Sequence, residues 1–161
     1  MCWTLYFDGL CEPNPGGVIA GAWVLIDPNG RQFQESAHAT DAEPGNTNNV
    51  AEYMAMFWGL SSLKEQMGPL WPGVAVFGDS QLVVKQINEE WSVKQPRLQI
   101  EHAKCLKLLN SVGPWVVDWV PSEKNEQADK IARACYRQFT GKTATVWSKP
   151  KRAEPLVPSR H

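Results

Sequence analysis

Hydrophobic and polar residues alternate along the first part of the chain, which is the pattern of half-buried β-strands. Apolar side chains at positions 3, 5 and 7 are separated by more polar ones at 4, 6 and 8. A second strand is predicted over 18–26 and a third over 31–39, with a turn-forming Asp-Pro-Asn-Gly sequence between them. The first 45 residues therefore predict an antiparallel meander of three strands.

From residue 47 onward the apolar residues follow a helical period. Thr47 or Asn48 is suited to cap a helix that runs to about residue 66, with its apolar side chains broadly on one side. The remaining pattern predicts, in order, a strand over 74–77, helices over 80–90 and 97–110, a strand over 115–120 and a helix over 125–139. The order βββαβααβα predicts an α/β fold, a five-stranded mixed sheet with helices packed on its faces.

Length and composition fit one globular domain. The chain has 161 residues, of which 43% are hydrophobic and 20% are charged. We place the domain at 1–139 and expect 140–161, a basic segment that contains prolines, to be a flexible tail. No apolar stretch approaches the roughly 20 residues of a membrane helix, so no membrane association is expected. Four cysteines without metal-like spacing or a secretion signal indicate a reducing, cytoplasmic location.

The net charge of −1 does not by itself suggest a nucleic-acid partner. The charge is unevenly distributed, however. Residues 140–161 hold five basic residues and one acidic residue, a balance of +4 that leaves −5 on the other 139 residues. If four carboxylates of the domain bind two divalent ions, the local charge changes sign. Net charge therefore neither supports nor excludes a nucleic-acid partner.

Four acidic residues occupy places where side chains from different elements meet. Asp8 is predicted at the end of the first strand and Asp79 where the fourth strand stops, while Glu52 and Asp129 lie near the starts of two helices. Each one taken alone is better explained as a turn or cap residue. Four converging carboxylates would repel one another, and hard divalent cations such as Mg²⁺ compensate that repulsion. The set therefore predicts a metal site.

The segments around these carboxylates resemble, in order and spacing, the four motifs of the type I ribonuclease H family. They are Asp8-Gly9 with Asn14-Pro15-Gly16, Thr47-Asn48-Asn49-Val50-Ala51-Glu52, Gly78-Asp79-Ser80-Gln81, and Asn125-Glu126-Gln127-Ala128-Asp129. The resemblance covers residues 3–139 and implies a ribonuclease H-like fold. It implies an endonuclease that hydrolyses the RNA strand of an RNA–DNA hybrid.

The resemblance also assigns roles to the carboxylates. Asp8, Glu52, Asp79 and Asp129 would be catalytic and would hold two Mg²⁺ ions, for which Mn²⁺ is expected to substitute. One ion would activate the attacking water and the other would stabilise the departing 3′-oxygen. The products would carry 5′-phosphate and 3′-hydroxyl ends.

Further residues match family positions that contact the hybrid. Amide side chains both donate and accept hydrogen bonds, as a 2′-hydroxyl does, which suits them to distinguish RNA from DNA. The matching residues are Asn14, Asn48, Asn49 and Gln81 for the minor groove, Thr47 for a DNA phosphate, and Trp91 and Lys94 for the region that faces the DNA strand. Simpler explanations exist, because Asn-Pro-Gly and Thr-Asn-Asn are also turn and cap sequences and tryptophan is more often a core residue.

The chain departs from the best-known family members in two places. Only residues 92–97 separate Trp91 from the next helix, so the basic helical handle of some members is missing. The loop 121–124 is short and lacks the histidine that many members carry near the active site. Both features are typical of a handle-less, short-loop branch found in archaea and some bacteria.

Two other interpretations remain open at this point. The chain is either an active nuclease or a catalytically silent module that binds hybrids, and all four carboxylates favour the nuclease. The domain also occurs within larger polyproteins such as reverse transcriptases, although Met1 lies close to the first strand and favours a free-standing protein. We expect a monomer with no obligate protein partner.

Overall fold

The computed structural model describes residues 2–67 and 72–142 of the chain. The strands are β1 (Trp3–Glu12), β2 (Val18–Ile26), β3 (Gln32–Thr40), β4 (Val74–Gly78) and β5 (Trp115–Trp119). The helices are α1 (Asn48–Met67), α2 (Gln81–Ile87), α3 (Pro96–Asn110) and α4 (Glu126–Thr140), and a short 3₁₀ helix, η1 (Ser122–Lys124), precedes α4. The predicted order of strands and α-helices is confirmed.

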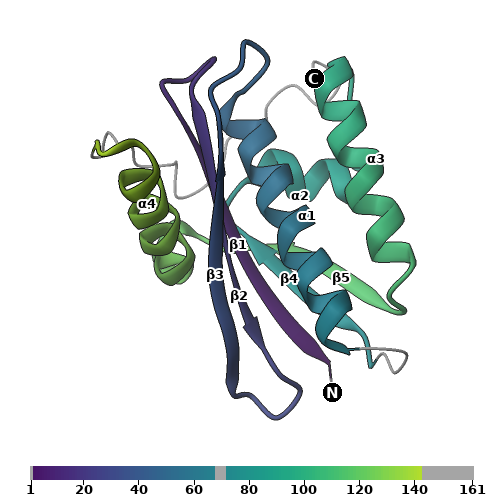
Figure 1. Ribbon diagram of the computed structural model, residues 1–161. Coiled ribbons are helices and arrows are strands. Elements are labelled where there is room, and N and C mark those ends of the chain that lie inside the picture. The colour runs from purple at the N-terminus through teal and green to yellow at the C-terminus, as the bar shows by residue number, and fades with distance from the viewer. Residues whose placement is uncertain (1, 68–71, 143–161) are drawn as a thin grey trace.

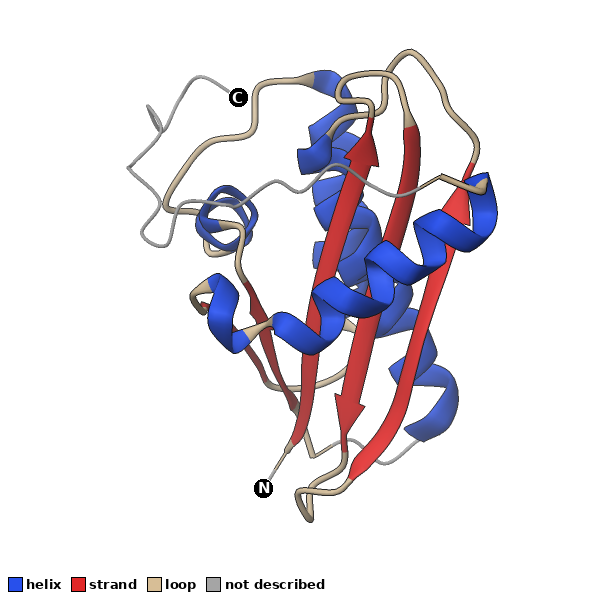
Figure 2. Ribbon diagram, turned by 90° about the vertical axis from the view of Figure 1, so that its left-hand side faces the viewer, coloured by secondary structure: helices blue, strands red, loops and turns tan. Residues whose placement is uncertain are grey.

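The five strands form one mixed sheet in the order β3-β2-β1-β4-β5. The first three strands are antiparallel neighbours, as the meander requires, whereas β4 pairs in parallel with β1 and β5 pairs in parallel with β4. Helices α1, α2 and α3 lie on one side of the sheet and α4 lies on the other (Figure 1). In Figure 2, α4 crosses in front of the strands. The sheet therefore separates two layers of helix and places β1 near the centre.

The main core lies between the sheet and α1. Alternate residues of β1, including Leu5 and Phe7, are fully buried and belong to the same cluster as Tyr53 and Met56 of α1. A smaller cluster under α4 is centred on Tyr136. Because both layers are packed against β1, this strand is a rigid base for side chains near its middle.

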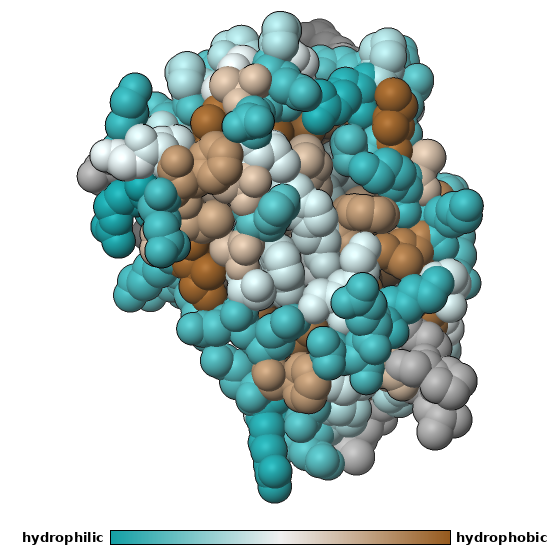
Figure 3. Space-filling model, in the orientation of Figure 1, coloured by the Kyte–Doolittle hydropathy of each residue, from teal (hydrophilic) through white to brown (hydrophobic). Residues whose placement is uncertain are grey.

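The described surface carries four exposed large hydrophobic side chains. They are Phe33, Ile100, Val116 and Phe139. On the side shown in Figure 3, hydrophobic residues are interspersed with hydrophilic ones. Among residues 2–67 and 72–142, the helices include none with the length and hydropathy of a membrane span.

The position of Asp8 within β1 differs from the prediction. The strand continues to Glu12, so Asp8 lies in its middle and not at its end. The reason is that β1 has different neighbours on its two sides: its pairing with β2 extends to Glu12, whereas its pairing with β4 stops at Tyr6, opposite Phe77. Asp8 therefore lies just beyond the end of β4, where the sheet opens on that side.

Two predicted ends of helices also differ. Helix α2 ends at Ile87 and not near residue 90, because Asn88 caps it and Glu89 takes a left-handed backbone conformation with φ of 61°. Helix α4 ends at Thr140, followed by Gly141 with φ of 74°. Residues 143–161, which hold most of the predicted tail, lie outside the described part of the chain. The division at residue 139 stays a prediction.

Candidate functional site

Three of the four predicted carboxylates meet in one place. Asp8 of β1, Glu52 of α1 and Asp79, which follows β4, each offer an oxygen, and these oxygens lie within 4.8 Å of one another. All three residues are buried, with exposed fractions of 2%, 2% and 6%. Residues separated by more than 70 positions in the chain are thus brought together by the parallel pairing of β1 and β4 and by the packing of α1 on β1.

The close approach of α1 to β1 depends on Gly9. A Cβ atom at this position would lie 2.2 Å from the carbonyl oxygen of Ala51 and 2.7 Å from the backbone nitrogen of Glu52. The Gly9 N–H donates to Oε1 of Glu52 at 2.9 Å, which orients that carboxylate beside Asp8. Glycine at this position therefore brings two of the acidic side chains together and aims one of them.

Asp79 is held where β4 gives way to α2. Ser80 caps α2 by accepting a hydrogen bond from the Val83 N–H at 3.3 Å. The indole Nε1 of Trp119, at the end of β5, donates to the carbonyl oxygen of Asp79 at 3.3 Å. Both contacts fix the backbone of Asp79, so its side chain is presented by a rigid turn.

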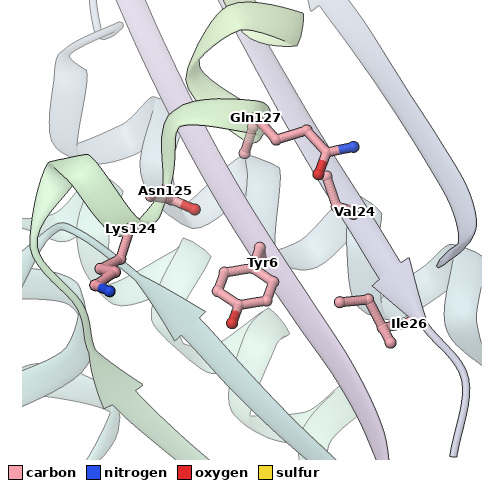
Figure 4. A pocket seen from close by; sticks show the side chains of 7 residues that line it. Tyr6, Val24, Ile26, Lys124, Asn125 and Gln127 are labelled. Atoms are coloured by element: carbon pink, nitrogen blue, oxygen red, sulfur yellow. The ribbon is translucent and has the colours of Figure 1, made fainter. Parts of the chain in front are cut away.

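Asn125 connects the start of α4 to β1. Its exposed fraction is 2%, and its Nδ2 donates to the carbonyl oxygen of Phe7 at 2.8 Å, directly before Asp8. Figure 4 shows Asn125 beside β1, together with Lys124 and Gln127 at the rim of a cavity of about 130 Å³. This hydrogen bond sets the distance between the first turn of α4 and the three clustered carboxylates.

Asp129, the fourth predicted carboxylate, is not a member of the cluster found among the described residues. It lies in the first turn of α4, and its side chain is 39% exposed. Nε of Arg133 donates to both carboxylate oxygens of Asp129, at 3.2 Å and 3.0 Å. The structure therefore places Asp129 on the helix that Asn125 anchors, with its carboxylate engaged by an arginine.

The donor set fits a hard divalent cation. The clustered oxygens all belong to carboxylates, and their separation lets a single ion contact more than one of them. Three like charges in a buried site repel strongly at such distances. Oxygen ligands of this kind suit Mg²⁺ and Mn²⁺. Asp8, Glu52 and Asp79 are thus the residues that could hold a metal here.

The predicted hybrid-contact residues Asn14 and Asn48 connect two loops. One is 13–17, between β1 and β2, and the other is 41–47, which leads from β3 into α1. Oδ1 of Asn14 accepts from the Asn48 N–H at 3.1 Å, and Oδ1 of Asn48 accepts from the Cys11 N–H at 2.8 Å. Buried Asn46, which sequence reasoning missed, donates from Nδ2 to the carbonyl oxygens of Gly17 and Asp41 at 2.9 Å and 3.2 Å. The two loops therefore form one surface beside the start of α1.

The other predicted polar contacts lie at the starts of helices. Thr47 accepts from the Val50 N–H at 3.2 Å, so it acts as the helix cap that the sequence allowed. Asn49 is half-buried in the first turn of α1. Among the residues that the structure describes, the buried Oε1 of Gln81 has no hydrogen-bond partner. Because this oxygen is buried, a ligand that donates a hydrogen bond reaches it only after the side chain turns.

Trp91 and Lys94 are placed differently from each other. Trp91 is 7% exposed and belongs to the main core, which favours packing over stacking on DNA. The depression beside it, of about 650 Å³, is also lined by Glu89 and Glu90, a poor surface for phosphates. Lys94 is exposed in the segment before α3, so its side chain is accessible to a nucleic acid. Its contact with the DNA strand stays a prediction.

Neither described histidine lies in the candidate site. The ring of His38, on β3, packs edge-on against Trp58 with centroids 4.9 Å apart. His102, on α3, lies with Nε2 3.1 Å from the carbonyl oxygen of Gln86. His161 falls outside the described residues. The first two therefore do not take the place of the histidine that loop 121–124 lacks in its sequence.

Hydrogen bonds link buried Gln86 of α2 to Tyr53 of α1 and to the backbone of Ser92. The Tyr53 hydroxyl donates to Oε1 of Gln86 at 2.7 Å, and Nε2 of Gln86 donates to the carbonyl oxygen of Ser92 at 3.2 Å. Burial raises the pKa of the Tyr53 hydroxyl and of the neighbouring Cys105 thiol well above their ordinary values. Both groups are therefore neutral, and their role is structural.

Comparisons with known proteins identify relatives over most of the chain. A family model described as reverse transcriptase-like matches residues 6–135. Ribonuclease H of Campylobacter concisus is 34% identical over 139 residues, which is 81% of this chain and 89% of that protein. Ribonuclease HI of Halobacterium salinarum is 35% identical over 127 residues, and the match spans 79% of this chain and 60% of that protein. The crystal structure of LC11-RNase H1 in complex with RNA/DNA hybrid matches with a TM-score of 0.78 at 29% identity and covers 85% of this chain and 98% of that chain.

Proposed function

The chain belongs to the ribonuclease H family, and from that premise we propose that it is an endonuclease that hydrolyses the RNA strand of RNA–DNA hybrids. The observation that carries the proposal is the convergence of Asp8, Glu52 and Asp79 within 4.8 Å in a buried site. A module that only binds hybrids has no use for three such carboxylates. The bound hybrid of LC11-RNase H1 supports the same substrate class.

Two Mg²⁺ ions are the cofactors that we propose for this site. Asp8, Glu52 and Asp79 would hold them, with Asp129 as a fourth ligand from α4. When bound, the ions would supply the Lewis acidity that activates the attacking water and stabilises the departing 3′-oxygen. Cleavage on that side of the phosphorus leaves 5′-phosphate and 3′-hydroxyl ends.

Described residues around the site hold the carboxylates in position. The Gly9 N–H aims the Glu52 carboxylate, and Trp119 holds the backbone of Asp79. Asn125 fixes the start of α4 against β1. Because these contacts exist before any substrate binds, Asp8, Glu52 and Asp79 need little rearrangement during the reaction, which is how preorganised sites lower a barrier.

Recognition of the RNA strand is proposed for the surface formed by the two joined loops and the start of α2. Asn14 and Asn48 use their acceptor oxygens within the protein, so their amide N–H groups are the atoms suited to meet a 2′-hydroxyl oxygen. Oε1 of Gln81 is buried without a hydrogen-bond partner, so it would accept from another 2′-hydroxyl only after its side chain turns toward the surface. Asn49 and Thr47 lie beside them at the start of α1. DNA, which lacks these hydroxyls, would leave such groups unsatisfied.

The test compares three labelled duplexes of the same sequence with the full chain and Mg²⁺. We expect the RNA strand of the hybrid to be cut and double-stranded RNA and DNA to remain intact. Asp79→Asn should lower turnover by several orders of magnitude while hybrid binding is retained, because the change removes a metal ligand and relieves repulsion of phosphate. Asp118→Asn, on the neighbouring strand β5 and exposed, is the matched control and should cut normally.

Two results would contradict the proposal. Near-normal cleavage by Asp79→Asn would exclude the metal site. Binding of the hybrid without any cleavage in Mg²⁺ or Mn²⁺ would favour the silent module instead. Mass spectrometry of the products tests the ends separately, since 3′-phosphate ends would contradict the two-ion chemistry and leave the substrate assignment intact.

A further inference from the structure

Asp129 differs from the other three carboxylates in its surroundings. Asp8, Glu52 and Asp79 are buried together, whereas the Asp129 side chain is 39% exposed on α4. Its two oxygens share the Nε–H of Arg133, one helical turn further along. A cation that binds the Asp129 carboxylate must therefore compete with this arginine.

The backbone of Asp129 is held in place independently of its side chain. Asn125 anchors the first turn of α4 through Phe7, and the Asp129 N–H donates to the carbonyl oxygen of Asn125 at 3.2 Å. What can change is therefore the side chain of Asp129 and the arginine that it contacts. Arg133 is 31% exposed, so its guanidinium can move toward solvent without leaving a buried charge behind.

Arg133 and a divalent ion make opposing demands on the same carboxylate. The guanidinium occupies both Asp129 oxygens, and its positive charge opposes a second positive charge nearby. An ion that takes Asp129 as a ligand must therefore displace Arg133 or share the carboxylate with it. Either event weakens the binding of that ion.

We propose that Arg133 is a positioning residue that holds the Asp129 carboxylate at the rim of the site and lowers the affinity of the ion that takes Asp129 as a ligand. The inference rests on the proposed function for the existence of that ion. It makes Asp129 a ligand that exchanges between an arginine and a metal, while Asp8, Glu52 and Asp79 stay in place. The concentration of divalent cation needed to fill the site is then set in part by a residue that does not contact the metal.

The test is a calorimetric titration of the full chain with Mn²⁺ alone, without nucleic acid. The Arg133→Gln variant should bind the ion that takes Asp129 as a ligand about three- to tenfold more tightly than the wild type does. This is the size expected for removing one partly screened charge near a divalent ion. Arg137→Gln is the matched control: it removes the same charge from the same helix one turn further away, from an exposed residue, and should change the affinity less than about twofold.

The same substitution in a chain that also carries Asp129→Asn shows whether Arg133 acts through the Asp129 carboxylate or through its charge alone. In an Asp129→Asn chain, the additional change Arg133→Gln should have little effect, because the carboxylate through which it acts is gone. Unchanged or weaker Mn²⁺ binding by Arg133→Gln would overturn the proposal. An equal gain in Arg137→Gln, a full gain in the Asp129→Asn background or a wild-type chain that binds no Mn²⁺ would do the same. Circular dichroism of each variant confirms that it is folded.

Hybrid cleavage is measured in parallel, so that the two proposals can fail separately. If the chain binds Mn²⁺ with the expected differences but cuts no hybrid, the proposed function fails and the role of Arg133 stands. If it cuts hybrids but Arg133→Gln requires as much metal as the wild type, only the role of Arg133 fails.

Discussion

Replacing Gly9 with alanine should damage the candidate site more than it damages the fold. The new Cβ atom would lie 2.2 Å from the Ala51 carbonyl oxygen, a distance that must grow to at least 3.0 Å, so β1 and α1 must separate by 0.8 Å or more. The atoms that it meets belong to backbone and cannot rotate away. The separation would occur between Asp8 and Glu52 and would stretch the 2.9 Å hydrogen bond from Gly9 to the Glu52 carboxylate.

The expected effects on rate and stability can be estimated separately. Misplacement of catalytic groups by about 1 Å can cost about 10²-fold in rate. Overpacking of a well-packed contact costs about 1–3 kcal/mol of folding free energy, which for a chain of this size lowers Tm by up to about 10 °C. We therefore expect Gly9→Ala to be folded at 25 °C and to cleave hybrid about a hundredfold more slowly.

Gly59→Ala provides the matched control for this prediction. Gly59 also lies in α1 against β1, but its nearest neighbour would be the Leu5 side chain, at 2.8 Å, whose tip can rotate. The Gly59→Ala variant should lose stability without losing turnover. Turnover is measured as kcat on a labelled hybrid, well below the melting temperatures of Gly9→Ala and Gly59→Ala. Wild-type turnover in Gly9→Ala, or an equal loss in folded Gly59→Ala, would refute the argument that this glycine sets the distance between the carboxylates.

The other predictions concern the buried residues behind the site. Tyr53→Phe should lower the free energy of unfolding in urea by about 1–3 kcal/mol, because it leaves the buried Oε1 of Gln86 without its donor; a neutral result would mean that the amide finds another partner. The thiol of exposed Cys2 should react with iodoacetamide in the folded chain at pH 8, whereas buried Cys105, whose pKa burial raises, should react only on unfolding. Because burial raises both pKa values, the unfolded chain loses the Cys105 and Tyr53 protons at lower pH than the folded chain does. The free energy of unfolding should therefore fall as pH rises above about 9. Flat stability between pH 8 and 11 would contradict that sign.

Much of the fold could be predicted because each element carries its own periodic signal. The strand 18–26 was predicted with its observed ends, and the helix after Thr47 to within one residue. The end of α2 could not be predicted in the same way. Glu89 adopts a left-handed backbone without being glycine, and Asn88 reaches the carbonyl oxygen of Val117 on β5, a contact between distant segments. No local pattern encodes such a contact.

The candidate site shows the same division. The four motifs located the carboxylates, and three of them do converge. The middle-strand position of Asp8 could not be predicted, because it depends on β1 having a longer neighbour on one side than on the other. The anchoring role of Asn125 and the contact of Arg133 with Asp129 depend on how α4 crosses the sheet. Asn125 was part of a motif, so a signal existed, but its partner on β1 did not follow from it.

If the proposed ions bind, the clustering of three buried carboxylates would also link the folding equilibrium to the supply of divalent cations. Without ions, the mutual repulsion of Asp8, Glu52 and Asp79 opposes the folded state and is absent from the unfolded chain. An ion that binds only the folded chain stabilises it by about 2.7 kcal/mol at a concentration 100 times its Kd. Resistance of this protein to heat and to proteolysis would then follow the free Mg²⁺ concentration, even when no nucleic acid is present.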